Sequence, residues 1–177
     1  MLVSVFIAIS LDGFIARKDG DIDWLTGDDS EESEDHGFGD FFNSVDALLM
    51  GKNTFEKVLS FGQWPYGDKK VIVASNSLKN LPEIKNANLQ LINGSPGEIF
   101  TKLEKQGYKK IYLDGGNLIQ SFLRDGLVDE LIISIIPVLI GDGIPLFGEV
   151  NQDIKLKLVD TKSCNNGIVQ TFYKVSK

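Results

Sequence analysis

Residues 2–9 have the sequence LVSVFIAI, and this stretch decides the fold that the rest of the chain must build. β-Branched and other apolar residues occupy both of its faces, which is typical of a strand buried in the centre of a parallel sheet. Further short apolar runs predict strands at residues 46–50, 71–74, 89–92 and 111–113, and helical segments separate most of them. This alternation predicts an α/β fold in which a mixed, mainly parallel sheet carries helices on both faces.

Two of the expected helices have clear end signals. Ser95, Pro96 and Glu98 have the spacing of a helix start, with a capping serine, a proline in the first turn and a glutamate three residues after the cap. Gly107 is placed to end that helix, and Gly126 to end a later one.

The last third of the chain changes character. Residues 128–138 predict a long apolar strand, and residues 154–163 and 168–175 alternate apolar and polar side chains around an Asn-Asn-Gly turn. An Asn-Gly pair between two such runs predicts a C-terminal antiparallel hairpin. Neither an internal repeat nor a linker interrupts the pattern, so residues 1–177 are expected to form a single domain.

Composition narrows the functional classes. The net charge of the 177 residues is −7 and the sequence pI is about 4.7, which argues against a nucleic-acid partner. The N-terminus lacks the basic region of a signal peptide, so the cytoplasm is the predicted location. The longest apolar run is too short to span a bilayer, so no membrane partner is expected. His36 and Cys164 are the single histidine and cysteine, so a His/Cys metal site is not expected, and His36 is predicted to have a solvated surface role.

Two glycine-rich turns follow predicted strands and precede predicted helices. One is Met50-Gly51-Lys52-Asn53-Thr54 and the other is Asp114-Gly115-Gly116-Asn117. Glycine allows backbone N–H groups to approach an anion, and a helix N-terminus adds positive partial charge. The turns could therefore hold the two ends of a dinucleotide, although each taken alone also fits a purely structural tight turn. The chain contains neither a GxGxxG fingerprint nor a P-loop.

An ordered set of motifs resembles the dihydrofolate reductase-like superfamily, and within it the reductase domain of bacterial riboflavin biosynthesis. The set comprises SVFIAISLDGFIA, LLMGKNTFE, WPYGDKKVIVASN, IYLDGGNLIQSFL and VDELIISIIPVLIGDGIPLF, and it runs nearly end to end. The resemblance implies a dihydrofolate-reductase-like fold and NADPH-dependent hydride transfer to a small heterocycle, pterin- or pyrimidine-like, or to a ribosylamino substrate. The activity implied is similar to that of 5-amino-6-(5-phosphoribosylamino)uracil reductase.

The resemblance also assigns cofactor-binding positions. Ala8 and Ile15 match residues that meet the nicotinamide, and Ser75 and Asn76 match the contact with the 2′-phosphate of NADPH. The remaining positions match the phosphate-binding and pyrophosphate turns: Gly51, Lys52, Thr54, Gly115, Gly116, Asn117 and Leu118.

On the substrate side, three residues are candidates for catalysis. Asp114 matches an acidic residue of the riboflavin-type reductases, and Ser134 falls at a substrate-side hydroxyl of the folate reductases. Counting on from Trp24 without gaps, Asp29 falls where folate reductases hold the pterin, although the acidic run around it also fits a solvated loop. Asp114 is either the proton source or a turn-capping aspartate. Asp68 replaces the basic residue that holds the glutamate tail of folate, and its carboxylate would repel that tail.

Two alternatives stay open: an authentic dihydrofolate reductase, and a nucleotide-binding module without catalysis. The apolar strand near residues 131–140 and the tail hairpin also predict a homodimer, because they offer more apolar surface than one small core needs.

Overall fold

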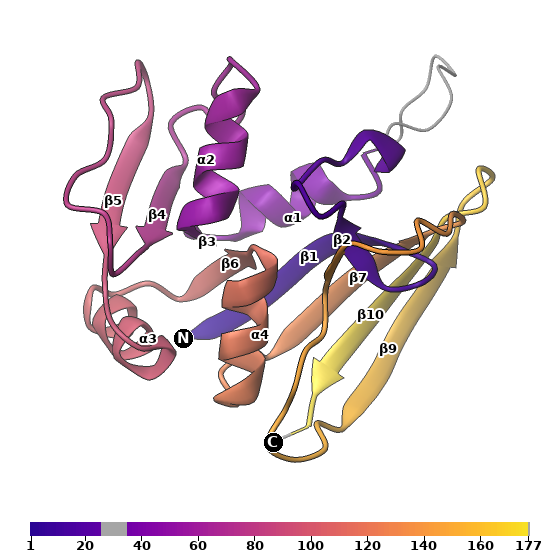
Figure 1. Ribbon diagram of the computed structural model, residues 1–177. Helices are drawn as coiled ribbons and strands as arrows, with labels where there is room; N and C mark the ends of the chain where they lie inside the picture. Colours follow the sequence, from indigo (N-terminus) through magenta and orange to yellow (C-terminus); the bar gives the residue numbers. More distant parts are fainter. Residues whose placement is uncertain (26–34, 177) are drawn as a thin grey trace.

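The computed structural model describes residues 1–25 and 35–176 (Figure 1). Its main sheet has eight strands in the order β5-β4-β3-β6-β1-β7-β10-β9. The first five strands along the chain that enter this sheet are β1 (Leu2–Ser10), β3 (Ala47–Gly51), β4 (Lys70–Ala74), β5 (Asn88–Ile92) and β6 (Lys110–Asp114). The other three are β7 (Glu130–Ile136), β9 (Leu156–Ser163) and β10 (Val169–Val175). Strand β1 lies between β6 and β7 and is parallel to both, which confirms the central position predicted for it.

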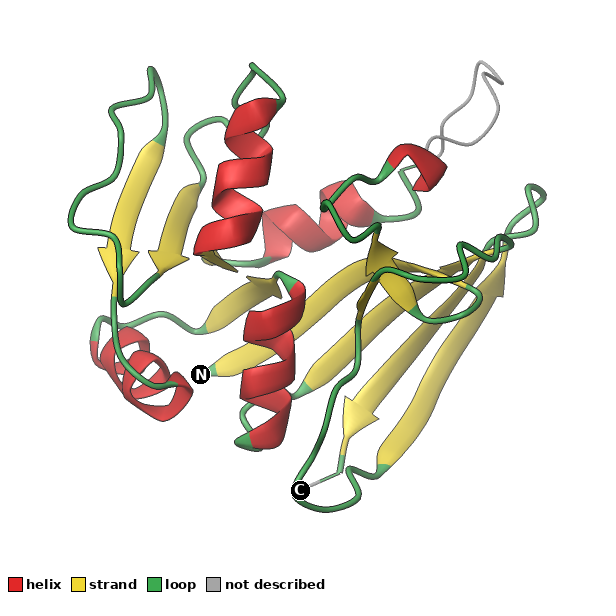
Figure 2. Cartoon of the chain, in the orientation of Figure 1, coloured by secondary structure: helices red, strands yellow, loops and turns green. Residues whose placement is uncertain are grey.

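Helices cover both faces of the sheet, as predicted (Figure 2). Helices α3 (Pro96–Lys105) and α4 (Gly116–Arg124) supply Ile99, Leu103, Ile119 and Phe122 to the core on one face. Helix α1 (Phe38–Ser44) and Phe55 of α2 (Lys52–Ser60) pack on the other face. The predicted capping box of α3 is present, because Ser95 and Glu98 bond each other's backbone N–H groups.

A second, two-stranded sheet joins the loops that follow β1 and β7. Strand β2 (Phe14–Ala16) pairs with β8 (Ile144–Pro145), and a short 3-10 helix follows at Asp23–Leu25. The Asp12 carboxylate strengthens this junction, because it accepts the N–H groups of Ile140 at 3.3 Å and Gly141 at 2.8 Å. Both loops are therefore held together beyond the carboxyl ends of the central strands.

The last strands differ in detail from the sequence prediction. The strand expected at residues 128–138 is shorter, since β7 ends at Ile136 and Pro137 has no N–H to continue the ladder. The C-terminal hairpin is confirmed: β9 and β10 pair antiparallel, and β10 pairs antiparallel with β7. Strand β9 forms one edge of the sheet and is exposed along its whole length.

Candidate functional site

A cavity of about 740 Å³ lies beyond the carboxyl ends of β1, β3 and β6. Both glycine-rich turns line it, one leading from β3 into α2 and the other from β6 into α4. The structure brings together ten of the predicted site residues on its wall: Ala8, Ile15, Gly51, Lys52, Thr54, Asp114, Gly115, Gly116, Asn117 and Leu118.

The two helices that begin at this cavity have free N-termini. Gly51 and Gly115 are the N-cap residues of α2 and α4, and within the described part of the chain no side chain caps either helix. Helix α3, by contrast, is capped by Ser95. The backbone N–H groups of an uncapped first turn are oriented to receive an anion, and the helix dipole favours negative charge there. Two such turns in one cavity suit a ligand with well-separated anionic groups, so the chain's residues fit a dinucleotide.

The glycine pair is required by close packing around the cavity. Gly115 has a φ of +97°, which other residues rarely adopt, and an added Cβ would overlap the Thr54 hydroxyl. At Gly116 an added Cβ would lie 2.8 Å from Ile15 Cδ1 and 3.3 Å from Ile144 Cγ2. The glycines thus let α2 and the β2–β8 sheet approach the turn closely.

Asp114 occupies the last position of β6, on the wall of the cavity. Its Oδ1 accepts the N–H of Gly115 at 2.8 Å. Burial raises the pKa of the carboxyl from 3.8 to about 6, and the hydrogen bond from Gly115 opposes part of that rise. Burial therefore favours the protonated form of this carboxyl more than in an exposed aspartate, which suits a group that gives up a proton.

Ser75 and Asn76 lie after β4 and are outside the described wall of the cavity. Ser75 Oγ accepts the N–H groups of Ser77 and Leu78, and Asn76 Oδ1 accepts the N–H of Gly94 at 2.9 Å. These bonds use the oxygens as acceptors. The Asn76 amide N–H₂ remains as a donor for an anion, whereas the Ser75 hydroxyl also lies 3.3 Å from Ser77 Oγ, and either of these hydroxyls could be the donor.

The other two catalytic candidates are placed differently. Ser134 is buried, accepts a hydrogen bond from Gln170 at 3.0 Å, and is paired with Ala8 across the β1–β7 ladder. It is separate from the described wall of the cavity. Asp29 lies outside the residues that the structure describes.

The structure corrects the interpretation of His36. Its side chain is half-buried, and its Nδ1 lies 3.4 Å from the sulfur of Cys164, although the two residues are far apart in sequence. Gln170 donates to the carbonyl of His36 at 3.1 Å. The histidine therefore packs against the C-terminal hairpin. Within residues 1–25 and 35–176, no group of three or more His, Cys, Asp or Glu side chains could hold a metal ion.

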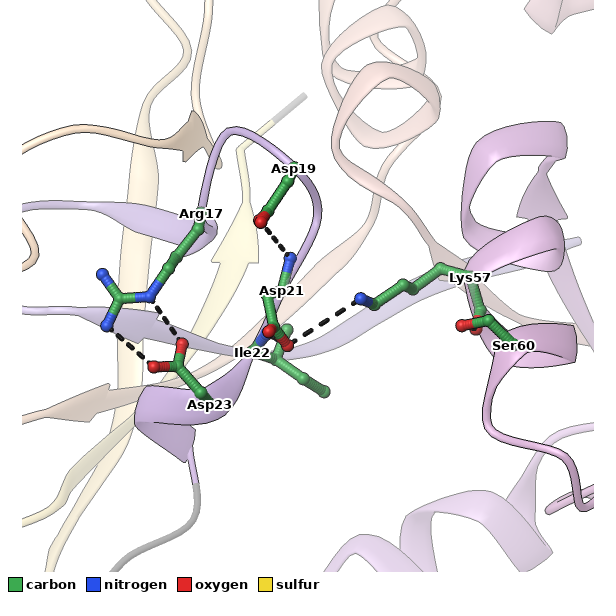
Figure 3. A network of polar contacts seen from close by, with 7 residues as sticks. All are labelled: Arg17, Asp19, Asp21, Ile22, Asp23, Lys57 and Ser60. Carbon is green, nitrogen blue, oxygen red and sulfur yellow. Dashed lines mark hydrogen bonds and ion pairs between the residues drawn. The ribbon is translucent and has the colours of Figure 1, made fainter.

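Sequence reasoning missed several polar residues of the cavity wall, among them Lys18, Lys57 and Tyr66. Lys57 Nζ of α2 lies 3.8 Å from Asp21 Oδ1 in the loop after β2, as Figure 3 shows. This ion pair connects α2 with that loop. Arg17 and Asp23 form a two-bond ion pair within the same loop. Tyr66 falls within the quoted WPYGDKK stretch, but only the fold shows that this stretch returns to the cavity.

Together, the fold and the cavity define the class of the protein: it has a dihydrofolate-reductase-like α/β fold with a cleft at the carboxyl ends of its central strands. The family follows from comparison with known proteins. The model of the RibD C-terminal domain matches residues 2–170, and the chain belongs to that family.

Two similar proteins match almost end to end. The uncharacterized protein YwjB of Bacillus subtilis is 36% identical over 167 residues, which cover 93% of this chain and 92% of YwjB. A crystal structure from Shewanella sp. PV-4, of a protein with a provisional assignment to riboflavin biosynthesis, is 38% identical, with a TM-score of 0.93 and 100% of both chains covered.

More distant structures share the fold. The diaminohydroxyphosphoribosylaminopyrimidine deaminase/5-amino-6-(5-phosphoribosylamino)uracil reductase of Thermotoga maritima gives a TM-score of 0.77 at 17% identity, with 99% of this chain and 56% of that one covered. The dihydrofolate reductase of Enterococcus faecalis, in complex with NADP(H) and RAB-propyl, gives 0.70 at 14% identity, with 99% and 97% covered. None of the helices in the described residues is both long enough and apolar enough to cross a membrane.

Proposed function

We propose that this chain is an NADPH-dependent reductase that transfers hydride to a small pyrimidine- or pterin-like heterocycle or to a ribosylamino compound. The activity would be similar to that of 5-amino-6-(5-phosphoribosylamino)uracil reductase. The observation that carries the proposal is the meeting of two uncapped helix N-termini and a buried carboxyl in one cavity. Membership of the RibD C-terminal domain family supports it.

The residues of the two turns would hold the cofactor. The N–H groups at the starts of α2 and α4 would bind its phosphates, and Lys52, which lines the cavity, would add a cation. Lys52 lies 3.7 Å from Glu56 in a partly exposed ion pair, which an anionic ligand can exchange at little cost. Ser75 and Asn76 would donate to the 2′-phosphate.

Ala8 and Ile15 would define the place of the nicotinamide. When bound, NADPH supplies the hydride. The small side chain of Ala8 leaves room for close approach of donor and acceptor carbons, and Ile15, packed beside Gly116, would exclude water from them. Asp114, on the same wall, would supply the proton that the reduced substrate requires.

The proposal extends to location and assembly. We propose that the enzyme acts in the cytoplasm as a homodimer, in which the exposed edge strand β9 takes part. Leu158 and Val159 of that strand are 54% and 55% exposed. Sedimentation of the purified protein tests the dimer, and a monomer at micromolar concentration would refute this part.

The decisive experiment follows the absorbance of NADPH with a panel of pyrimidines, pterins and ribosylamino compounds. Oxidation of NADPH with a pyrimidine or ribosylamino compound supports the proposal. Efficient turnover of dihydrofolate would make the protein an authentic dihydrofolate reductase. Tight binding of NADPH without oxidation by any compound would favour a non-catalytic nucleotide-binding module.

A further inference from the structure

Asp12 ties together the two loops that meet beside the cavity. It follows β1, and its carboxylate uses both oxygens: Oδ1 accepts the N–H of Ile140 at 3.3 Å, and Oδ2 accepts the N–H of Gly141 at 2.8 Å. Ile140 and Gly141 belong to the loop between β7 and β8. Hydrogen bonds from backbone N–H groups to a charged acceptor are strong, and the donors cannot turn away as mobile side chains can.

The same carboxylate reaches the start of β2 through a buried hydroxyl. Ser10, which is fully buried, donates its O–H to Asp12 Oδ1 at 2.5 Å, and its Oγ accepts the N–H of Phe14 at 3.0 Å. The hydrogen bond from Ser10 is the largest cause that lowers the pKa of Asp12, so the carboxylate stays ionised and acts only as an acceptor. Asp12 thus fixes the backbone that leads into β2.

Ile15 is the cavity residue whose position depends on this arrangement. It follows Phe14 in β2 and lines the cavity. Its Cδ1 lies so close to the turn before α4 that a Cβ added at Gly116 would be 2.8 Å away. Asp12 itself lies outside the described wall of the cavity, so it acts on a bound ligand through the residues that it positions.

The pairing of β2 with β8 is too short to fix β2 by itself. It joins Phe14 with Pro145 and Ala16 with Ile144, and the register shifts between these pairs. Pro145 has no N–H to donate, and a short two-stranded ribbon is marginally stable alone. The hydrogen bonds of Asp12 therefore add a constraint that the strand pairing lacks.

We propose that Asp12 is a positioning residue for the nicotinamide: by tying the loop after β1 to the loop after β7, it holds Ile15 where the nicotinamide would bind. This inference rests on the proposed function, in which Ile15 meets the nicotinamide and the two phosphate-binding turns hold the rest of NADPH. Asp12 therefore contributes to the affinity for the nicotinamide half of the cofactor and not to that for the adenosine half.

Two probes separate the halves of the cofactor. NADPH carries the nicotinamide, whereas 2′,5′-ADP contains only adenosine with its 2′- and 5′-phosphates. Asp12→Asn keeps the size of the side chain but replaces one acceptor oxygen by an amide N–H₂, which cannot accept. In calorimetry of the whole protein, the variant should bind NADPH about three- to tenfold more weakly than wild type and should bind 2′,5′-ADP equally well.

Asp46→Asn is the matched control. The Asp46 carboxylate also accepts two consecutive backbone N–H groups, from Lys109 at 2.6 Å and Lys110 at 2.9 Å, but it lies at the amino ends of β3 and β6, away from the cavity. Its replacement should change the affinity for neither probe. Unchanged NADPH binding in Asp12→Asn, or equal weakening of both probes, would overturn the inference, because the second result would mean a general loss of structure.

Hydrogen exchange tests the same inference without a cofactor. The amides of residues 13–16 should exchange faster in Asp12→Asn than in wild type, whereas Asp46→Asn should match wild type there. Ser10→Ala removes only the hydroxyl between Asp12 and Phe14, and it should give the same changes to a smaller degree, so it keeps the test open if Asp12→Asn does not fold. Wild-type exchange rates in residues 13–16 of the folded variants would also overturn the inference.

Failure of this inference can be told apart from failure of the proposed function. If folded wild-type protein does not bind NADPH, the proposed reductase function fails, and the role of Asp12 towards the nicotinamide fails with it. If wild type binds NADPH and Asp12→Asn binds it equally well, only the role of Asp12 fails.

Discussion

Asp114 is the buried carboxyl that we propose as the proton donor, and its replacement by Asn removes its ability to titrate. Because burial raises the pKa of Asp114 in the folded protein, folding favours its protonated form. The wild-type protein should therefore lose stability as the pH rises from the unfolded-state pKa towards the folded-state pKa, and should level off above it. Asp114→Asn, which is neutral throughout, should not show that loss.

The size of the effect follows from the shift. A rise from 3.8 to about 6 corresponds to about 3 kcal/mol, at ~1.36 kcal/mol for each unit of pKa. Asp114 lines an open cavity, and contact with water reduces this figure. The free energy of unfolding of Asp114→Asn should exceed that of wild type by about 1–3 kcal/mol near pH 7.5, and the difference should vanish near about pH 3.5.

Urea unfolding at a series of pH values measures this difference. Asp46→Asn is the control of opposite sign, because N–H groups of Lys109 and Lys110 donate to the Asp46 carboxylate and lower its pKa. In wild-type protein, the stability that the Asp46 carboxylate contributes should be present above its unfolded-state pKa. This stability should be lost as the pH falls through the lower folded-state pKa. Parallel stability curves of wild type and Asp114→Asn between about pH 4 and about pH 7 would refute the reasoning, because they would mean that Asp114 has an ordinary pKa.

Three further changes test the cavity. Gly116→Val should displace Ile15 and weaken NADPH binding at least tenfold. The control is Gly97→Ala, whose added Cβ meets no atom within 4 Å, and this variant should bind NADPH normally. Equal NADPH affinities of the two variants would show that close packing at Gly116 does not matter for cofactor binding. Lys57→Met removes the ion pair with Asp21 and should speed NADPH dissociation a few-fold in stopped-flow measurements, and an unchanged rate would show that the ion pair does not hold the loop. Dihydrofolate should be turned over slowly with a high KM, and Asp68→Arg should lower KM more than it changes kcat. Rapid turnover of dihydrofolate by wild type would contradict the expected repulsion between Asp68 and the glutamate tail of folate.

The sequence predicted those parts of the fold that local physical chemistry decides. The apolar run of β1, the capping box at Ser95 and the Asn-Gly turn of the hairpin all carry their signal within a few residues. The end of β7 was missed by two residues, since apolar side chains continue past Pro137 although the backbone ladder cannot. The placement of the two glycine turns at one cavity followed from the rule that parallel strands end at the same edge.

Contacts between distant segments could not be predicted in this way. Tyr66 lies in a loop whose sequence gives no sign that it reaches the cavity wall that also contains Asp114. The pairing of His36 with Cys164 likewise depends on how the hairpin folds back towards the start of α1. The hydrogen bonds that Ser75 accepts from Leu78 and that Asn76 accepts from Gly94 also depend on tertiary geometry.

Titration of the purified protein with NADPH and with NADH tests the central claim most directly. The N–H groups at the starts of α2 and α4 should bind the phosphates of both cofactors, and Lys52, Ser75 and Asn76 should add contacts to the 2′-phosphate of NADPH alone. We predict one NADPH bound per chain, with an affinity at least about tenfold higher than that for NADH. Equal affinities would contradict the assignment of the 2′-phosphate contacts, and the absence of binding of either cofactor to the folded protein would contradict the reductase account itself.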